Sequence, residues 1–276
     1  MTQSTEQDSV QEAFERWLGR THTPAHARRN AARNAAFLLP HLRPGMRLLD
    51  AGCGPGSITL GLAEAVAPGE AVGIDRSDGA IDASGALASE KAVPNVRFEV
   101  ASIYALPFED ASFDAAFVHA VLQHLSEPLR ALREVRRVLK PGGVIGVADA
   151  DYAGSLMHPS SPALEQALDL QIRMREHSGT PPFVGRRLRE LLHDAGFPRN
   201  AAFVVADCDG ALETAQRAGA YWADYFSAPE FVAYVTSSRL ASEADLREMS
   251  EAWRTWGQHP GAFWGRMWCQ AVGWAM

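Results

Sequence analysis

The chain has 276 residues, 47% of them hydrophobic, which is enough for one large domain, or one domain with a cap, around a sizeable core. Its formal net charge of −7 argues against a nucleic-acid groove or an anionic membrane surface. The three cysteines form neither a C-x-x-C motif nor an even-numbered framework, which favours a reducing cytoplasm. We expect neither a signal peptide nor a membrane span, because the N-terminus is polar and no apolar run reaches 18 residues.

Two helices are predicted before the first strand. The first covers about 10–18, where apolar residues recur at helical spacing before Gly19. The second runs from about 25 to 42 and is closed by Pro40 and Pro44. Residues 1–44 are therefore expected to form an N-terminal helical segment.

A glycine-rich turn follows the first apolar run. The run ends in Asp50, and Gly52, Gly54 and Gly56 stand at alternate positions before a helical pattern begins. Glycine is favoured where the backbone has positive φ or approaches a ligand closely. The spacing is G-x-G-x-G, not the G-x-G-x-x-G of dinucleotide sites, and no phosphate-loop lysine follows. The turn is expected to lie against a nucleoside without cradling a phosphate.

Strands and helices then alternate regularly. Strands are predicted at 71–75, 96–101, 113–119 and 144–150, and helices at 77–91 and 128–139. This alternation predicts a parallel sheet with helices on both faces and a ligand at the carboxyl edge of the strands. Asp75 ends the second strand at that edge, where a carboxylate can accept both hydroxyls of a ribose.

The rest of the chain is predicted to complete the sheet. Helices are expected at 163–177 and 184–195, strands at 202–208 and 262–275, and a helical insertion at about 210–257. The final strand should return antiparallel beside 202–208. We therefore expect residues 45–210 and 259–276 to form one domain, with 211–258 as a helical cap.

Four motifs, in this order and spacing, resemble the class I S-adenosylmethionine-dependent methyltransferases, most closely the branch of ubiquinone and menaquinone biosynthesis. They are D-x-G-C-G-x-G at 50–56, the G-x-D acid Asp75, L-P-F-x-D-x-S-F-D at 106–114 and R-V-L-K-P-G-G at 137–143. The resemblance covers roughly residues 26–151. It implies a Rossmann-like, seven-stranded and mostly parallel sheet whose last strand is antiparallel. It also implies S-adenosylmethionine as the cofactor.

The resemblance carries over a set of cofactor-binding residues. Arg29 ends a His-x-x-Arg segment and would pair with the cofactor carboxylate, although a solvated basic turn is an equal alternative. Ser102 stands where the family often has Asp, which weakens the adenine contact or moves it to a backbone N–H, and Ile103 would pack on the adenine. The full set is Arg29, Asp50, Gly52, Cys53, Gly54, Gly56, Asp75, Arg76, Ser102, Ile103 and His119.

His119 is the candidate catalytic residue, because it closes the fourth strand at the cofactor rim and histidine is suited to general-base work near neutral pH. The alternative is that only its backbone carbonyl is used, toward the cofactor ammonium. Asp149 and Asp151 share one face of a strand, but no His or Cys clusters with them. We therefore predict no metal site.

The acceptor is expected to be a small molecule, flat or lipophilic, methylated on a thiol or hydroxyl. The residues predicted to contact it are Tyr152, His158, Tyr221, Trp222 and Tyr225. Several segments look similar to methyltransferases of microbial secondary metabolism. The alternatives are a non-catalytic S-adenosylmethionine-binding scaffold or sensor, and a nicotinamide-dependent oxidoreductase. A homodimer is a further expectation.

Overall fold

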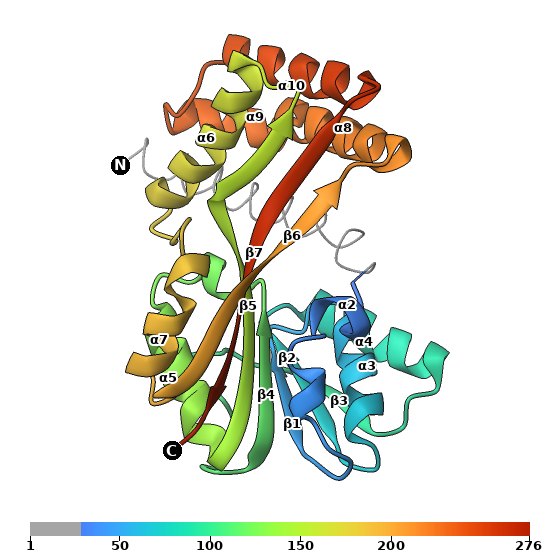
Figure 1. The fold of residues 1–276 in the computed structure, drawn as a ribbon, viewed down its shortest axis with the longest axis vertical. Coiled ribbons are helices and arrows are strands. Elements are labelled where there is room, and N and C mark those ends of the chain that lie inside the picture. The colour runs from blue at the N-terminus through green and yellow to red at the C-terminus, as the bar shows by residue number, and fades with distance from the viewer. Residues whose placement is uncertain (1–28) are drawn as a thin grey trace. The chain divides into compact units, whose positions relative to one another are not determined.

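The computed structural model describes residues 29–276 (Figure 1). The predicted helix at 10–18 and the start of the second predicted helix lie outside the described residues. The chain divides into two compact units. The first, here called the sheet unit, comprises the described residues 29–150, 183–205 and 268–276. The second, the helical unit, comprises the described residues 151–182 and 206–267.

Seven strands form a single sheet in the order β3-β2-β1-β4-β5-β7-β6 (Figure 1). The strands β1 to β5 pair in parallel, and β7 lies between β5 and β6 as an antiparallel partner. This arrangement confirms the predicted sheet and the return of the last strand beside the sixth. The strands are β1 (Leu48–Ala51), β2 (Ala71–Asp75), β3 (Val96–Val100), β4 (Phe113–His119), β5 (Leu139–His158), β6 (Arg199–Asp209) and β7 (Phe263–Trp274).

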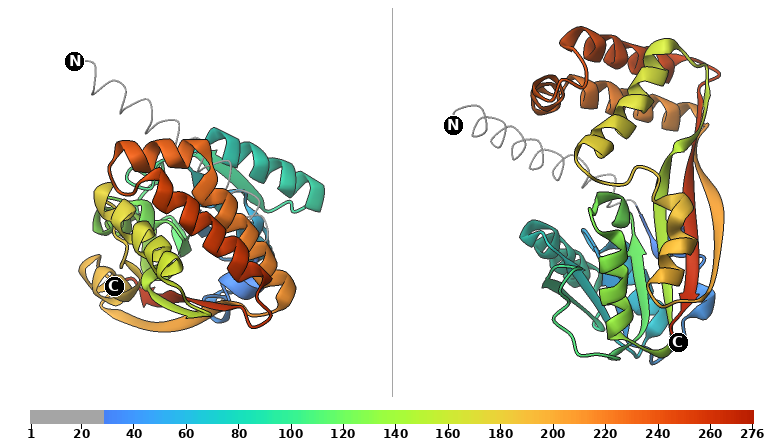
Figure 2. Two further views of the ribbon diagram at one scale, coloured as in Figure 1. Left: turned by 90° about the horizontal axis from the view of Figure 1, so that it is seen from above. Right: turned by 90° about the vertical axis from the view of Figure 1, so that its left-hand side faces the viewer.

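Helices of the sheet unit cover both faces of the sheet (Figure 2). Successive strand residues point to opposite faces, so Leu49 and Ala116 enter one core while Leu48 and Ala115 enter the other. Because both faces are buried, these strands read as continuous apolar runs. The helices and 3₁₀ turns are α2 (Ala31–Asn34), η1 (Leu39–His41), α3 (Ser57–Val66), α4 (Asp78–Lys91), η2 (Leu122–His124), α5 (Pro128–Val138), η3 (Gly185–Arg187) and α7 (Leu188–Asp194).

The prediction of one continuous helix up to residue 42 is wrong for the described residues. The helix α2 ends at Asn34, and a 3₁₀ turn with Pro40 near its start follows. Proline has no N–H to continue an α-helix, and the chain instead turns so that Ala35 and Leu38 are fully buried. The predicted helix at 184–195 is likewise divided into η3 and α7.

The strand β5 is much longer than the predicted 144–150. Its N-terminal extension contains Gly142 and Gly143 of the R-V-L-K-P-G-G motif. Gly142 N–H donates to Ala275 O at 2.8 Å, and Ala275 N–H donates to Gly143 O at 2.8 Å, so pairing with β7 begins here. Beyond Ala150 the strand continues into the helical unit.

Within residues 29–276, four helices of the helical unit pack around an aromatic core. They are α6 (Pro162–His177), α8 (Leu212–Ser227), α9 (Pro229–Ser237) and α10 (Glu243–Gln258). Ser242 caps α10 reciprocally with Asp245, which satisfies N–H groups that the first turn leaves unpaired. The predicted helical stretch 210–257 thus consists of α8, α9 and α10. Its role as a cap stays a prediction.

The helices α8 and α10 approach each other closely at two glycines. A Cβ on Gly219 would stand 2.7 Å from Gly257 Cα and 2.7 Å from Trp253 O. Only glycine permits this separation, since the opposing atoms belong to the backbone.

No helix within residues 29–276 is both long and apolar enough to cross a bilayer.

Candidate cofactor site

The loop between β1 and α3 has three glycines with positive φ, at 89° for Gly52, 53° for Gly54 and 79° for Gly56. A Cβ at Gly52 would meet Val121 Cγ2 at 2.3 Å, and one at Gly56 would meet Ser84 Cβ at 2.8 Å. A Cβ at Gly54 would meet nothing within 4 Å. The outer glycines are therefore required by packing, whereas Gly54 faces open space.

Asp75 ties this loop to the end of β2. Its Oδ2 accepts the Gly54 N–H at 3.0 Å, and its Oδ1 accepts the Ser77 N–H at 3.0 Å. The carboxylate is half-buried, so lone pairs remain available to further donors. The loop and the acid at the carboxyl edge of the parallel strands thus form one preassembled surface.

Asp50 lies beneath the loop and is only 2% exposed. Burial raises the pKa of its carboxyl to about 7, although Thr59 Oγ1 donates a hydrogen bond to Oδ2 at 2.6 Å. Its side chain thus joins the end of β1 to α3, the helix that follows the loop. Burial, with Asp50 and Asp75 nearby, also raises the pKa of the Cys53 thiol far above its ordinary value, so this thiol stays protonated.

Three further predicted cofactor residues follow the next two strands. Arg76 is exposed directly after Asp75. Ser102 is exposed after β3, and its Oγ accepts the Tyr104 N–H at 3.2 Å. Ile103 is buried within one core of the sheet unit, which ties this loop to the sheet.

His119 ends β4 and is 7% exposed. Its ring stacks on Trp268 with a centroid separation of 5.1 Å and an interplanar angle of 14°. Its Nε2 lies 3.4 Å from Asn34 Nδ2. Arg29 completes the group, with its Cζ 5.6 Å from the Trp268 ring centroid. The imidazole orientation is therefore fixed by neighbours from α2 and β7.

Sequence reasoning missed Asn34, Trp268 and Thr59 as parts of this site. Trp268 belongs to a tryptophan-rich tail, and nothing in that composition distinguishes it from core tryptophans such as Trp264. Its contact with His119 depends on the register of β7 in the sheet. That register could not be derived from local sequence.

Asp149 stabilises the turn after His119. Its carboxylate is fully buried and accepts the N–H groups of Leu122 at 3.1 Å and Gln123 at 3.3 Å. Burial raises the pKa of this carboxyl to about 7, against the effect of these hydrogen bonds and of Arg29. The Asp149 side chain therefore fixes the backbone of the turn at Leu122 and Gln123. No cluster of three or more potential metal ligands occurs in residues 29–276.

The predicted substrate residues all belong to the helical unit. Tyr225 is buried in its core, whereas Tyr152, Tyr221 and Trp222 are half-buried. Trp222 stacks on Trp253 at 5.7 Å, in line with a packing role for at least part of its surface. His158 is exposed, and its ring meets the ring of His259 edge-on at 6.2 Å.

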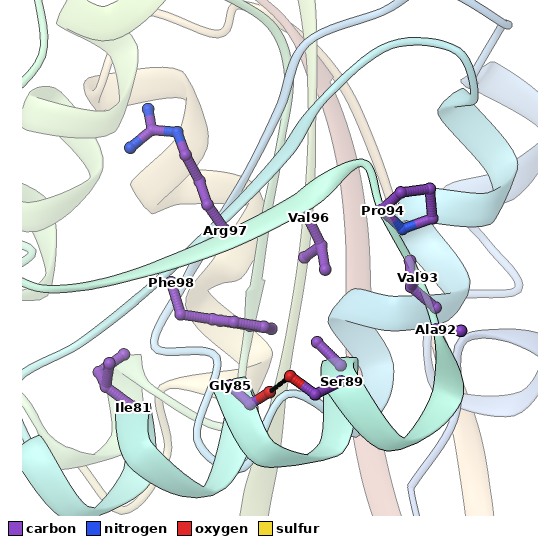
Figure 3. A pocket seen from close by; sticks show the side chains of 10 residues that line it. Ile81, Gly85, Ser89, Ala92, Val93, Pro94, Val96, Arg97 and Phe98 are labelled. Atoms are coloured by element: carbon purple, nitrogen blue, oxygen red, sulfur yellow. Dashed lines mark hydrogen bonds between the residues drawn. The ribbon is translucent and has the colours of Figure 1, made fainter.

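The sheet unit has two hollows that lie away from Gly54 and Asp75. One of about 530 Å³ lies between α4 and β3, where Phe98, Val96 and Ile81 supply apolar surface (Figure 3). Another of about 790 Å³ is lined by residues of α2, α3 and α4 and by Arg29. The linings of both hollows lack Gly54 and Asp75, so neither defines the glycine-loop site.

Comparison with known proteins identifies the family. The family model described as "Methyltransferase domain" matches residues 42–196. A demethylmenaquinone methyltransferase of Lactococcus lactis is 30% identical over 182 residues, which cover 66% of this chain and 68% of that protein. The chain belongs to the class I S-adenosylmethionine-dependent methyltransferases. S-adenosylmethionine is accordingly its cofactor.

Another relative of this methyltransferase chain is an uncharacterized methyltransferase of Schizosaccharomyces pombe. It is 38% identical over 178 residues, covering 62% of this chain. The match spans 64% of the yeast protein, slightly less than two thirds of its length.

Solved structures confirm the Rossmann-like fold. The YcgJ protein of Bacillus subtilis aligns with a TM-score of 0.58 and 22% identity, over 88% of this chain and 98% of that one. The [4+2]-cyclase SpnF aligns with a TM-score of 0.53 and 24% identity, over 91% of this chain and 84% of that one.

The methyltransferase's glycine loop fits the cofactor. A nucleoside needs close backbone approach and an acceptor for its ribose hydroxyls. Gly54 presents backbone to open space, and Asp75 presents a half-buried carboxylate directly beside it. Both lie at the carboxyl edge of β1 and β2, where ligands bind in open parallel sheets.

Proposed function

We propose that this chain transfers the methyl group of S-adenosylmethionine to a thiol or hydroxyl of a small molecule. The observation that carries the proposal is the preassembled surface of Gly54 and Asp75 at the carboxyl edge of the sheet. Family membership adds the chemistry, because the bound cofactor supplies an electrophilic methyl group on a sulfonium.

The proposal includes a contact with the cofactor for each predicted site residue. Asp75 would accept the ribose hydroxyls, and the Gly54 backbone would lie against the nucleoside. The loop after β3, with Ser102 and Ile103, would contact the adenine, and Arg29 would pair with the carboxylate. The His119 carbonyl would accept from the ammonium. Gly52, Cys53 and Gly56 would contribute through the backbone, with Asp50 supporting the loop and Arg76 at its exposed margin.

The chain's own part in the transfer is positioning and proton management. Methyl transfer requires the acceptor atom to be held near the methyl carbon with water excluded. We assign the acceptor proton to the His119 imidazole, acting as a general base. The stacked Trp268 ring keeps that imidazole in one plane, so its nitrogens have fixed directions.

The acceptor class rests on the helical unit. Tyr152, His158, Tyr221, Trp222 and Tyr225 would supply an amphipathic surface suited to a flat or lipophilic small molecule. Small substrates also appear among proteins of similar fold, such as a geranyl diphosphate methyltransferase aligned with a TM-score of 0.52. A role in secondary metabolism is part of this proposal.

The proposed setting is the cytoplasm. The described free thiols include the exposed Cys208, which suits a reducing compartment. A homodimer remains part of the proposal, to be measured by sedimentation.

A second candidate is S-adenosylmethionine binding without methyl transfer. It is favoured by the likeness to SpnF, whose name gives a cyclase activity. The two candidates differ in one outcome, since only a methyltransferase converts the cofactor to S-adenosylhomocysteine in the presence of an acceptor.

The test begins with thermal unfolding in S-adenosylhomocysteine and in NAD at equal concentration. A ligand at about 100 times its Kd should add roughly 2.7 kcal/mol of stability. Asp75→Ala should remove most of the shift caused by S-adenosylhomocysteine. An equal or larger shift with NAD would overturn the proposal.

Methyl transfer is then measured as the S-adenosylhomocysteine that is released when a panel of thiols and phenols is offered as acceptors. Binding of the cofactor without this release favours the second candidate.

A further inference from the structure

Arg175 on α6 is a half-buried cation without a carboxylate partner among residues 29–276. Its Nη1 donates to the Gln171 carbonyl at 3.3 Å and to Gln171 Oε1 at 3.4 Å, and its Nη2 donates to the Tyr152 hydroxyl. Its Nε is buried and makes no hydrogen bond within the described part of the chain. By contrast, Arg173 on the same helix pairs with Asp169 at 2.7 Å.

Tyrosines from β5 and α8 interact with this guanidinium. Its Cζ lies 3.7 Å from the Tyr152 ring centroid, and its charge acts on the Tyr225 phenol. Gln171, which is 6% exposed, also bonds to Tyr225. Tyr221 lies one helical turn before Tyr225 on α8, with the two ring centroids 6.3 Å apart. We call these five residues the arginine–tyrosine cluster.

The tyrosines in this cluster cannot neutralise the arginine. Burial raises the pKa of Tyr221 to about 12 and that of Tyr225 further, so both phenols stay protonated near neutral pH. The cluster therefore holds a net positive charge surrounded by hydroxyl groups that can donate hydrogen bonds. A partly desolvated charge without a counter-ion is costly, which is a reason to expect an anion from outside the described chain.

We propose that the arginine–tyrosine cluster binds the carboxylate of an aromatic or lipophilic small molecule. The guanidinium fork matches a planar carboxylate in shape and charge. The rings of Tyr221 and Trp222, with centroids 5.4 Å apart, both lie beside the Tyr225 ring and provide apolar surface on α8. That this molecule is the methyl acceptor rests on the proposed function; the binding subsite does not.

The test compares 2-naphthoate with 2-naphthamide, an uncharged molecule of nearly the same shape. Both are titrated calorimetrically at pH 7.5 into the full chain saturated with S-adenosylhomocysteine. The wild type should bind naphthoate at least tenfold more tightly. Arg175→Gln should abolish this preference, whereas the control Arg173→Gln should retain it. Equal binding of both probes by the wild type, or an unchanged preference in Arg175→Gln, would overturn the proposal.

Arg175→Lys keeps the test decisive if Arg175→Gln does not fold. Lysine retains the charge but loses the planar fork, so naphthoate affinity should fall at least threefold with unchanged affinity for S-adenosylhomocysteine. An unchanged naphthoate affinity would contradict the proposal.

Failure of the subsite and failure of the proposed function give different results. If naphthoate preference persists but S-adenosylhomocysteine does not bind, the function is wrong and the subsite stands. In the opposite case, S-adenosylhomocysteine binds and Arg175→Gln changes nothing, so the subsite alone is wrong. For that reason, the titrations with 2-naphthoate and 2-naphthamide are repeated without S-adenosylhomocysteine.

Discussion

At the residue scale, neighbouring glycines of one loop serve different purposes. Gly54→Ala places a methyl group in open space, so its structural cost is the positive φ alone, about 1 kcal/mol. Gly56→Ala adds contacts of 2.8 Å to Ser84 and 2.9 Å to Phe98, so it should destabilise the fold by roughly 2–4 kcal/mol. We expect Gly54→Ala to weaken S-adenosylhomocysteine binding more than it lowers stability. Calorimetric binding together with urea unfolding measures both. Undiminished binding by Gly54→Ala would mean that the cofactor does not face this glycine.

The buried Asp50 carboxyl should make stability dependent on pH. Its pKa rises from 3.8 to about 7 on folding, so between these values the folded state holds a proton that the unfolded state has lost. Stability therefore falls as pH rises through this window and levels off above it. From pH 5 to pH 8 the loss from this group is about 3 kcal/mol.

Asp50→Asn removes that titration and keeps an oxygen acceptor for Thr59. Relative to wild type, the variant should gain about 3 kcal/mol between pH 5 and pH 8. Urea unfolding at both pH values measures the difference, and other titrating groups cancel in the comparison. Parallel pH dependences would show that Asp50 is ionised in the folded state.

The variant His119→Phe distinguishes two roles of this side chain, which are general-base catalysis and stacking on Trp268. Phenylalanine can stay stacked on Trp268 and leaves the backbone carbonyl in place, so cofactor affinity and stability should change little. Loss of a general base should lower kcat by about 10²- to 10⁴-fold. The pH–rate profiles of both forms are the decisive measurement. If the acid limb is the same in both, the imidazole is no base and catalysis rests on positioning, as a thiol that is already partly ionised would allow.

The residues of the glycine loop could be predicted because a turn with positive φ is determined by residues that are close together in the sequence. Asp75 could be placed since a parallel strand ends with it. The stacking of Trp268 on His119 and the contacts of Arg175 join residues about 150 and 23 positions apart. Such pairs depend on strand register and helix orientation, for which one sequence gives no signal.

At the scale of elements, the contact between α8 and α10 should tolerate no side chain. Gly219→Ala would force a methyl group against two backbone atoms and should cost about 1–3 kcal/mol. The matched control is Gly85→Ala on α4, where a Cβ meets nothing within 4 Å and should add about 0.5–1 kcal/mol. Thermal unfolding should thus shift in opposite directions for the two variants. A neutral Gly219→Ala would mean that the helices can separate without cost.

Element types were read correctly from apolar periodicity, and β2 and β4 even in their bounds. The errors share one cause. The extension of β5 is decided by pairing with β7, and the break after α2 by the burial of Leu38. Both are tertiary effects that override local pattern. Pro40 and Pro44 were taken as the end of a helix at about residue 42, whereas the helix already ends at Asn34.

At the scale of the whole molecule, three strands continue from one unit into the other. They are β5, β6 and β7, and we expect this continuity to couple the unfolding of the two cores. Four tryptophans, at 222, 253, 256 and 264, belong to the helical unit's core, so fluorescence reports mainly on that unit. The glycine loop belongs to the sheet unit.

Saturating S-adenosylhomocysteine should therefore shift the fluorescence-detected urea transition, by about 2.7 kcal/mol at 100 times its Kd. NAD at the same concentration is the control. The opposite outcome is that S-adenosylhomocysteine leaves the fluorescence-detected urea transition unchanged but shifts part of the transition measured by far-UV circular dichroism. That result would mean that the two units unfold independently.

The preassembled Gly54–Asp75 surface has a consequence for turnover. It would hold the nucleoside, which is identical before and after transfer, and it does not depend on the methyl group. Binding energy of this kind is uniform and favours the product as much as the substrate. Product inhibition should follow, with S-adenosylhomocysteine competing against the cofactor. The rate in a cell would then depend on how quickly another enzyme degrades that product.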